Sequence, residues 1–359
     1  MKVYIDNPYD QTLLGTFQKQ PFGNHGSCAN KLVFHNSNSK WFFKLFEEDI
    51  NDLQVGDVFT SFIYKQLGLP KTDFVEYRFA SFEGKGEDGF GVICPYFVPN
   101  DAKVIGAWEI KLKNHAKQFG WDLSSYNSDE MVQSITDDKM EKLIDIEFSK
   151  SGEYRSSVES IISDLEIYAQ NNNLSVDIKD ISFKLKRMII LDYFLVQKDR
   201  HMANIEFLIK DNQITLAPIF DNEYAFGMDH KEFYKETFAS DRKRFRLRTG
   251  LTTAGGSIKE YRTNKIFRYG GIVAVDILDE IKHDKRLKNV VDRCLSLDIN
   301  RCIDLFEKEI YDLTQEQEAL IKNEFLKRRQ QFYSTIALLK KKTGRKDIFQ
   351  FNKQPEKSQ

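Results

Sequence analysis

The sequence predicts an α/β (α+β) protein with two lobes, in which a β-rich N-terminal lobe precedes a mainly helical C-terminal lobe. Short apolar runs divided by turn residues occupy the first lobe, and longer runs with helical periodicity occupy the second. A chain of 359 residues is long enough for two or more domain-sized cores. We expect the lobes to span residues 1–99 and 100–347, followed by a disordered tail at 348–359.

Charge and hydropathy exclude several classes of protein. Lys and Arg nearly balance Asp and Glu, and the formal net charge of -1 gives no global field that would attract nucleic acid or a membrane surface. The N-terminus lacks an apolar signal region, and no apolar run reaches the roughly 18 residues of a membrane helix. We therefore expect a cytoplasmic protein, and export by a signal-independent route stays open.

The cysteines are few and widely spaced, at Cys28, Cys94, Cys294 and Cys302. They form neither a Cys-x-x-Cys pair nor a Cys/His cluster, so no structural zinc site is expected. Low cysteine usage is typical of a reducing compartment. We predict free thiols.

The first lobe begins with a small polar loop that contains Gly26 and Ser27. The pattern loop, strand, turn, strand follows, in the ranges 22–31, 32–34, 37–39 and 41–46. A loop of Gly and Ser before a hairpin can bring backbone N–H groups close to phosphate oxygens. The same composition is common in ordinary turns, so this loop alone does not define a site.

Lys44 lies in an otherwise aromatic and apolar strand. Such a lysine either extends its charge to water or meets an anion. The next helix is predicted near 52–67 and ends at a Gly-Leu-Pro stop. Asp57 of this helix is favoured by the helix dipole as a solvated residue of the first turn.

The remaining elements of the first lobe are two strands at 73–82 and 90–97, separated by a Gly-rich turn. Tyr96 and Phe97 end the second strand and lead into the next lobe. From 102 to 173 the chain is polar and is predicted to be helical, and a helix at 180–194 carries an apolar stripe that buries it.

An acid and amide pattern follows that helix. Asp199 opens an Asp-Arg-His triplet, Asn204 lies five residues later, and Asp221 follows a second apolar strand. Phosphoryl transfer needs a carboxylate that orients the attacking hydroxyl and oxygen ligands for Mg²⁺. Asp199 is suited to the first task, and Asn204 and Asp221 to the second. Asp and Asn also favour turns for local reasons, but their register with two strands favours the catalytic interpretation.

This pattern resembles the HipA-like serine/threonine protein kinases, and its short members in particular. The core Asp-Arg-His-x-x-Asn is shared with lipid kinases of the phosphatidylinositol type, whereas the continuation Ala217–Asp221 favours the HipA side. The resemblance runs from about Gly23 to about Lys340. One departure is that Asp221 is followed by Asn222 and Glu223, where kinases commonly have Phe and Gly.

The resemblance implies a two-lobed kinase-like fold that uses ATP and Mg²⁺. It implies that Asp199 is the catalytic base and that Asn204 and Asp221 are the metal ligands. It places the phosphate loop at Gly26 and Ser27, the strand lysine and its partner acid at Lys44 and Asp57, and the adenine-binding hinge at Tyr96 and Phe97. His201 is expected to be a buried structural support of the catalytic loop. The basic residues between 242 and 248 either receive an acidic or phosphorylated segment or form a solvated loop.

The implied activity is transfer of the ATP γ-phosphate to a Ser or Thr of a protein, as in bacterial toxins and effectors, with an antitoxin or a host protein as a further expected partner. Autophosphorylation of Ser27 is also implied, because a phosphoserine there would lie where the nucleotide phosphates belong. Two alternatives stay open. A kinase of lipids or small hydroxyl compounds shares every catalytic residue, and a catalytically silent kinase fold would serve as a binding module.

Overall fold

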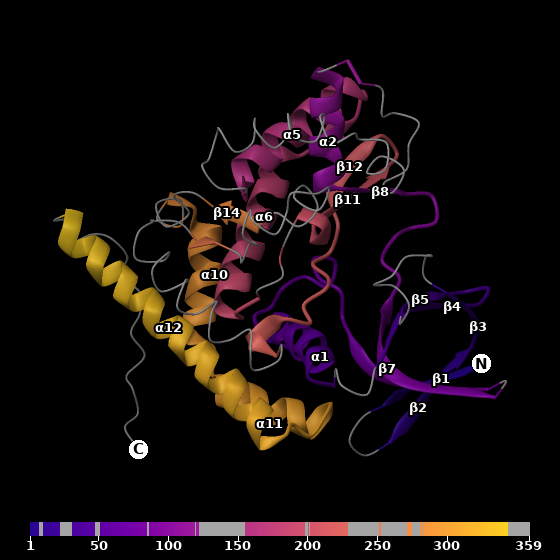
Figure 1. Cartoon of the computed structure of the whole chain (residues 1–359). Helices are drawn as coiled ribbons and strands as arrows, with labels where there is room; N and C mark the ends of the chain where they lie inside the picture. Colours follow the sequence, from indigo (N-terminus) through magenta and orange to yellow (C-terminus); the bar gives the residue numbers. More distant parts are fainter. Residues whose placement is uncertain are drawn as a thin grey trace.

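The computed structural model describes residues 1–6, 10–21, 31–46, 51–84, 86–118, 120–121, 155–197, 200, 202–228, 251–252, 271–274, 281 and 283–343. These residues form a β-rich part near the N-terminus and a larger, mainly helical part beside it (Figure 1). The predicted α/β class is confirmed. The predicted division at residue 99 stays a prediction, and the chain leaves the first sheet at Pro95.

The β-rich part is a seven-stranded sheet with the order β2-β1-β6-β7-β5-β4-β3. Its strands are β1 Lys2–Asp6, β2 Gln11–Thr16, β3 Gln18–Pro21, β4 Lys31–His35, β5 Lys40–Leu45, β6 Arg78–Gly84 and β7 Glu87–Pro95. Every pair in it is antiparallel, so short turns suffice to connect β4 with β5 and β6 with β7.

Two predicted strands have different bounds in the structure. The strand expected at 73–82 begins only at Arg78, because Phe74 forms an isolated parallel bridge with Ile219 of the helical part. The strand expected at 90–97 begins earlier, at Glu87, and ends at Pro95, so the turn before it is shorter than predicted. The strands β1, β2 and β3 were not predicted.

An aromatic cluster stabilises one face of this sheet. The rings of Phe34, Phe43 and Phe82 lie 5.2 to 5.4 Å apart, centroid to centroid. Successive side chains of a strand point to opposite faces, so Lys44, next to Phe43 on β5, points to the other face of the sheet. The close approach of β5 to β7 requires Gly91, since a Cβ there would lie 1.9 Å from the Lys44 carbonyl oxygen.

The helical part contains α1 Asn51–Gln66, α2 Ala107–Gln118, α5 Val158–Asn171, α6 Ile178–Phe194, α10 Lys285–Ser296, α11 Ile299–Glu309 and α12 Gln315–Thr343. The predicted helices at 52–67 and 180–194 correspond to α1 and α6. A capping box begins α12, because the Gln317 N–H donates to Thr314 Oγ1 at 3.2 Å and the Thr314 N–H donates to Gln317 Oε1 at 3.0 Å.

Two small sheets accompany the helices. The first has the order β10-β12-β11-β8, with bounds Ser175–Val176, Gln213–Leu216, Glu206–Lys210 and Lys103–Gly106. The second has the order β13-β14-β9, with bounds Leu251–Thr252, Gly271–Ala274 and Arg155–Ser157. The expectation that 102–173 is wholly helical is therefore wrong at β8 and β9, which pair with distant strands, and 122–154 lies outside the described residues.

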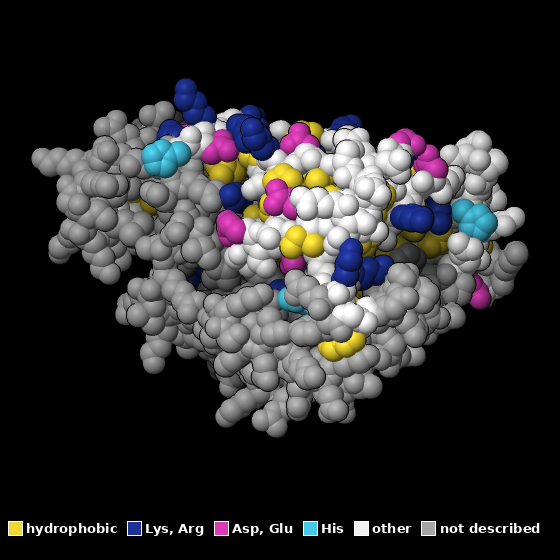
Figure 2. Space-filling view, turned by 90° about the horizontal axis from the view of Figure 1, so that it is seen from above, with side chains coloured by type: hydrophobic (Ala, Val, Ile, Leu, Met, Phe, Trp, Pro, Cys, Tyr) yellow, Lys and Arg dark blue, Asp and Glu magenta, His cyan; other side chains and the backbone are white. Residues whose placement is uncertain are grey.

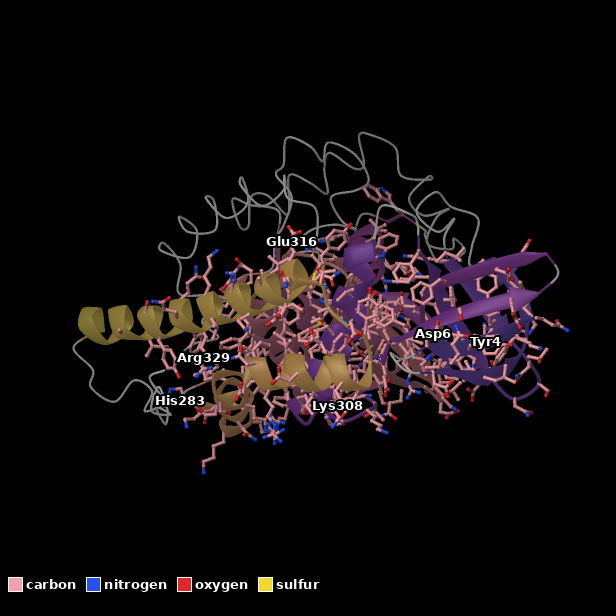
Figure 3. All side chains as sticks on the ribbon, turned by 90° about the horizontal axis from the view of Figure 1, so that it is seen from below. Tyr4, Asp6, His283, Lys308, Glu316 and Arg329 are labelled. Carbon is pink, nitrogen blue, oxygen red and sulfur yellow. The ribbon has the colours of Figure 1, made fainter. Side chains whose placement is uncertain are left out.

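Helix α1 packs against later elements of the helical part through aromatic side chains. The ring of Phe59 lies 4.9 Å from that of Phe306 on α11 and 5.2 Å from that of Phe226, and Phe62 lies 5.5 Å from Phe306. In Figure 3, Tyr4 and Asp6 of the sheet lie at one end of the molecule, and His283 and Arg329 lie toward the other. Helix α1, which follows β5, is thus held in place by residues from the C-terminal half of the chain.

The mixed surface charge and the free cysteines of the described residues agree with the expectations from composition. On the face shown in Figure 2, basic and acidic side chains are interspersed over the described surface. Among the described residues, Cys94, Cys294 and Cys302 are buried free thiols. The described helices include none that is long and apolar enough to cross a membrane.

Candidate active site

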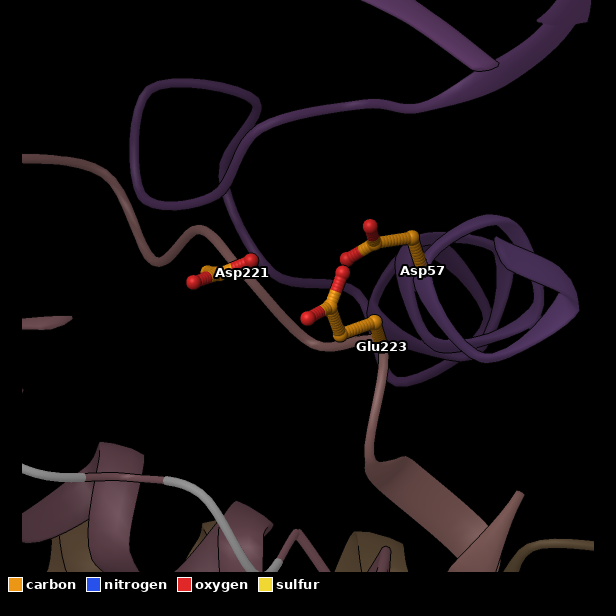
Figure 4. Close-up of side chains that lie close together, drawn as sticks. All are labelled: Asp57, Asp221 and Glu223. Atoms are coloured by element: carbon orange, nitrogen blue, oxygen red, sulfur yellow. The ribbon is translucent and has the colours of Figure 1, made fainter. Parts of the chain in front are cut away.

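Lys44 lies at the centre of a buried charged cluster. Its Nζ donates to Asp57 Oδ2 at 2.8 Å, to Asp221 Oδ1 at 2.7 Å and to Glu223 Oε2 at 3.2 Å. The three carboxylates come from two elements, α1 and the loop after β12, and point toward one another (Figure 4). The Lys44 side chain is only 4% exposed, so these ion pairs are little screened by solvent. The structure therefore contains the Lys44–Asp57 pair that the sequence suggests.

Asp57 connects α1 to the loop that carries Asp221. One of its oxygens accepts from Lys44, and the other accepts from the backbone N–H of Asn222 at 2.6 Å. The preceding residue, Gly56, makes this approach feasible, because a Cβ there would lie 2.4 Å from the Glu223 carbonyl oxygen. Asp57 is thus not a solvated residue of the first turn.

Three carboxylates around one ammonium leave an excess of negative charge. Burial lowers the pKa of Lys44, but the carboxylates, Asp221 foremost, outweigh burial and raise that pKa well above its ordinary value. Burial, partly opposed by Lys44, raises the pKa of Asp57 to about 6. Burial alone would raise the pKa of Asp221, but the charges of Lys44 and Lys31 outweigh it and hold that pKa below its ordinary value.

The backbone at Asp221 is held in an uncommon conformation. Its φ is 57°, in the left-handed region that Asp tolerates better than most residues. Gln197 Nε2 donates to the Asp221 carbonyl at 2.9 Å, and the Asp221 N–H donates to Tyr77 Oη at 3.4 Å. These contacts from both parts of the chain turn the Asp221 carboxylate toward Lys44.

Arg200 connects the loop after α6 to the loop around Asp221. It is fully buried, and its Nε donates to Asp192 Oδ2 of α6 at 3.0 Å. Its other guanidinium nitrogens donate at 2.7 Å to the Phe220 carbonyl and to Asn222 Oδ1. The sequence predicted a supporting role for His201, which lies outside the described residues. The role of His201 therefore stays a prediction. Arg200, which was not predicted as a site residue, holds the loop around Asp221 through contacts with other loops that local sequence does not reveal.

The other predicted site residues are placed as follows. Asn204 is buried and ends a short 3-10 helix, Met202–Asn204, which is separated from the start of β11 by one residue. Strands β11 and β12 form an antiparallel hairpin, and the chain then continues to Asp221, which lies five residues beyond the end of β12 and not at a strand end. Asp199, Gly26 and Ser27 lie outside the described residues.

Tyr96 and Phe97 follow β7 at the connection between the two parts. The Tyr96 N–H donates to the Lys40 carbonyl at 2.9 Å, which continues the pairing of β5 with β7. The ring of Phe97 stacks on that of Phe220, with centroids 5.7 Å apart. The predicted hinge therefore contacts the residue directly before Asp221.

Two further charged residues, Lys31 and Glu206, interact electrostatically with Asp221. Lys31 of β4 is directly opposite Lys44 in the register of β4 and β5, so both side chains project from the same face of the sheet. Burial, and then the carboxylates of Glu109 and Asp221, raise the pKa of Glu206 to about 7. Neither Lys31 nor Glu206 was predicted, because the strand registers that place them cannot be read from local sequence.

The carboxylates around Lys44 are of the type that also binds hard divalent cations, and in this structure the Lys44 ammonium lies among them. One carboxylate oxygen each from Asp57, Asp221 and Glu223 lies within 4.8 Å of the others. Carboxylate oxygens with an excess of negative charge are the ligands that Mg²⁺ prefers. Glu223 was not predicted as a site residue, although a second acid two positions after Asp221 was visible in the sequence.

Comparisons with known proteins identify the fold. No family model and no curated protein matches the sequence. Among solved structures, the chain is similar to the crystal structure of a Helicobacter pylori proinflammatory kinase, CtkA, with 15% identity and a TM-score of 0.50 over 89% of this chain and 94% of that one. CtkA is a HipA-like kinase, the kind of protein that the sequence resembles. At this identity the likeness establishes a kinase-like fold, as predicted.

Proposed function

We propose that the protein is an ATP- and Mg²⁺-dependent kinase that transfers the γ-phosphate to a Ser or Thr hydroxyl of a protein. The observation that carries this proposal is the buried contact of Lys44 with Asp57 and Asp221. A strand lysine paired with a helix acid, beside the metal-binding acid, is the arrangement that kinases use to hold nucleotide phosphates. The kinase-like fold supports the same conclusion.

Each residue has a distinct task in this proposal. Asp221 and Asn204 would hold Mg²⁺, which when bound neutralises charge on the nucleotide phosphates. Lys44 would bind phosphate oxygens while Asp57 keeps its ammonium in place. Gly26 and Ser27 would cover the phosphates, and Tyr96 and Phe97 would place the adenine.

Asp199 would act on the substrate. Its carboxylate would accept the proton of the attacking hydroxyl as that oxygen bonds to the γ-phosphorus and the bond from that phosphorus to the bridging oxygen breaks, which leaves ADP. A base of this kind contacts the nucleophile more than the nucleotide. Asp199→Ala should therefore lower turnover by about 10² to 10⁴ and leave ATP affinity nearly unchanged.

The partners follow from the same proposal. We expect a protein substrate, an antitoxin or host protein as regulator or target, a cytoplasmic location in a bacterium, and no direct contact with nucleic acid or membrane. Ser27 is the proposed autophosphorylation site. A kinase of lipids would use the same residues, so the substrate class needs its own experiment.

The test uses the purified chain with Mg²⁺ and [γ-³²P]ATP. One arm offers a bacterial protein mixture, and the other offers phosphoinositide vesicles. Label on protein Ser or Thr that is lost in Asp199→Ala supports the proposal. Label on lipid alone would indicate a lipid kinase, and label in neither arm, nor on the chain itself, would indicate a silent binding module.

A further inference from the structure

A second charged cavity lies between the C-terminal end of α1, α6 and α10. Its volume is about 240 Å³, and no residue of the candidate active site described above lines it. Three arginines line it together with Asn289 and the ring of Phe183: Arg187, Arg286 and Arg293. The lining contains no acidic residue. Three guanidinium groups around a hollow of this size are typical of an oxyanion site.

Arg187 is the most deeply buried of the three, with only 6% of its surface exposed. One of its terminal nitrogens donates to Asp73 Oδ2 at 2.8 Å. Its Nε is buried and has no hydrogen-bond partner. Arg187 therefore contributes a positive charge at the wall of the cavity, which Asp73 partly balances.

Phe183 orients two of the arginines. The guanidinium carbon of Arg286 lies 4.3 Å from the ring centroid of Phe183, and that of Arg187 lies 5.4 Å from the same centroid. Contact with an aromatic ring fixes the plane of a guanidinium, whose N–H groups lie in that plane. Both groups are therefore held against the same ring before any ligand binds.

Arg293 completes the set from about two turns further along α10 than Arg286. It donates to the Leu67 carbonyl at 2.7 Å and to the Gly68 carbonyl at 3.4 Å, at the end of α1. The position of the Arg293 side chain also depends on the absence of a side chain at Gly68, because a Cβ there would lie 2.9 Å from the Arg293 guanidinium. These carbonyls fix the side chain but do not neutralise its charge.

The charges around the cavity do not balance. Asp73 pairs with Arg187, and Asp284 pairs with Arg286 at 3.2 Å, whereas Arg293 donates to backbone carbonyls among the described residues. The Asp284 pair is exposed, with 57% of the Arg286 side chain accessible, so a stronger anion can displace it at little cost. An anion of two charges would match the arginines better than the existing partners do.

We propose that this cavity is a binding site for a phosphoryl group, either free phosphate or the phosphate of a small monoester. Arg forks bind the oxygens of a phosphate in pairs, and Asn289 adds an amide donor. A bound water takes roughly 30 Å³, so the cavity has room for a phosphate and a short attached group. The proposal is independent of the kinase activity proposed above.

The experiment is a calorimetric titration of the full chain with sodium phosphate, at an ionic strength held constant with chloride. O-phosphoserine in a second arm distinguishes an ester from free phosphate. We expect saturable binding that Arg286→Gln weakens about tenfold or more, since a charge-assisted contact contributes at least roughly 1.4 kcal/mol. Arg301→Gln, an exposed arginine of α11, is the matched control and should have no effect.

Asp284→Asn tests the same site in the opposite direction. Asp284 Oδ1 caps the Arg286 N–H at 2.8 Å, and Asn is an equally good cap, so the helix is preserved while the competing charge is removed. We expect phosphate to bind more tightly to this variant. Saturable binding that neither Arg286→Gln nor Asp284→Asn alters, or no saturable binding of phosphate or phosphoserine, would overturn the proposal.

Discussion

At the residue scale, the Lys44 ammonium determines whether three buried carboxylates can be accommodated. Lys44→Met would leave Asp57, Asp221 and Glu223 without their cation. Removing one partner of a buried ion pair costs roughly 3 to 5 kcal/mol, and we expect a loss of this size in urea denaturation. The double variant with Asp57→Asn should recover part of it. A single variant as stable as the wild type would show that the cluster is not formed.

The pKa of Asp57 predicts a pH dependence. Its folded-state pKa of about 6 lies above its ordinary value of 3.8, so the folded protein binds the proton more tightly than the unfolded chain. The resulting stability is present at low pH and is lost as pH rises through 6. Relative to Asp57→Asn, the wild type should gain about 1 kcal/mol between pH 7 and pH 5. Parallel pH profiles of the two proteins in thermal unfolding would contradict this assignment.

The sequence predicts individual site residues when the chemistry requires a fixed spacing. Asn204 and Asp221 follow from the position of Asp199, and Lys44 stands out as a charge in an apolar strand. Arg200 and Glu223 were missed, because their partners are set by tertiary contacts between loops. Local spacing contains no information on those contacts.

At the element scale, α1 must approach the loop after Phe220 closely. Gly56→Ala would place a Cβ 2.4 Å from the Glu223 carbonyl. Without this contact, Gly to Ala in a helix would stabilise the protein by up to about 1 kcal/mol. The sign of the change in unfolding free energy therefore distinguishes helix propensity from the clash with the Glu223 carbonyl. We expect destabilisation of roughly 1 to 3 kcal/mol from overpacking in chemical denaturation.

Gln66→Ala, an exposed substitution at the end of the same helix, is the control and should change stability by less than about 0.5 kcal/mol. A stabilised Gly56→Ala protein would mean that α1 and the loop are not in contact.

Helices and strands were predicted well where apolar periodicity is strong. They were predicted poorly where a strand forms only through pairing with a distant strand. Helix α6 and strands β4 and β5 were predicted from periodicity. Strand β8 was missed because it exists only through its pairing with β11, more than a hundred residues later along the chain. The start of the strand at 73–82 was wrong because Phe74 pairs with Ile219 instead of continuing the sheet.

At the scale of the whole molecule, the helix that carries Asp57 is anchored to the C-terminal helices. Phe306→Ala would remove the ring contacts with Phe59 and Phe62. We expect a loss of roughly 3 to 5 kcal/mol and weaker nucleotide binding, because α1 positions Asp57. Calorimetry and urea denaturation measure both quantities.

Leu326→Ala is the matched control for this variant, since that side chain of α12 is 43% exposed. It should leave both quantities nearly unchanged. Stability lost without any change in nucleotide affinity would show that the anchoring of α1 does not act on the site.

The two-part architecture was predictable from the change in apolar periodicity along the chain, but the contacts that join the parts were not. The ring of Phe97 meets that of Phe220, and Lys44 of the sheet meets Asp221 of the helical part. Both contacts depend on how the parts pack together.

The central claim is that Lys44, Asp57 and Asp221 form a Mg²⁺-nucleotide site. The most direct test is calorimetric titration with ATP, with and without Mg²⁺, of the wild type, Asp221→Asn and the control Asp211→Asn, which makes the same change in an exposed turn. We predict Mg²⁺-dependent binding of ATP to the wild type and to the control. The ATP affinity of Asp221→Asn should be lower by a factor of about ten or more, which is a difference of at least roughly 1.4 kcal/mol. Equal ATP affinity of all three proteins at saturating Mg²⁺ would contradict the claim.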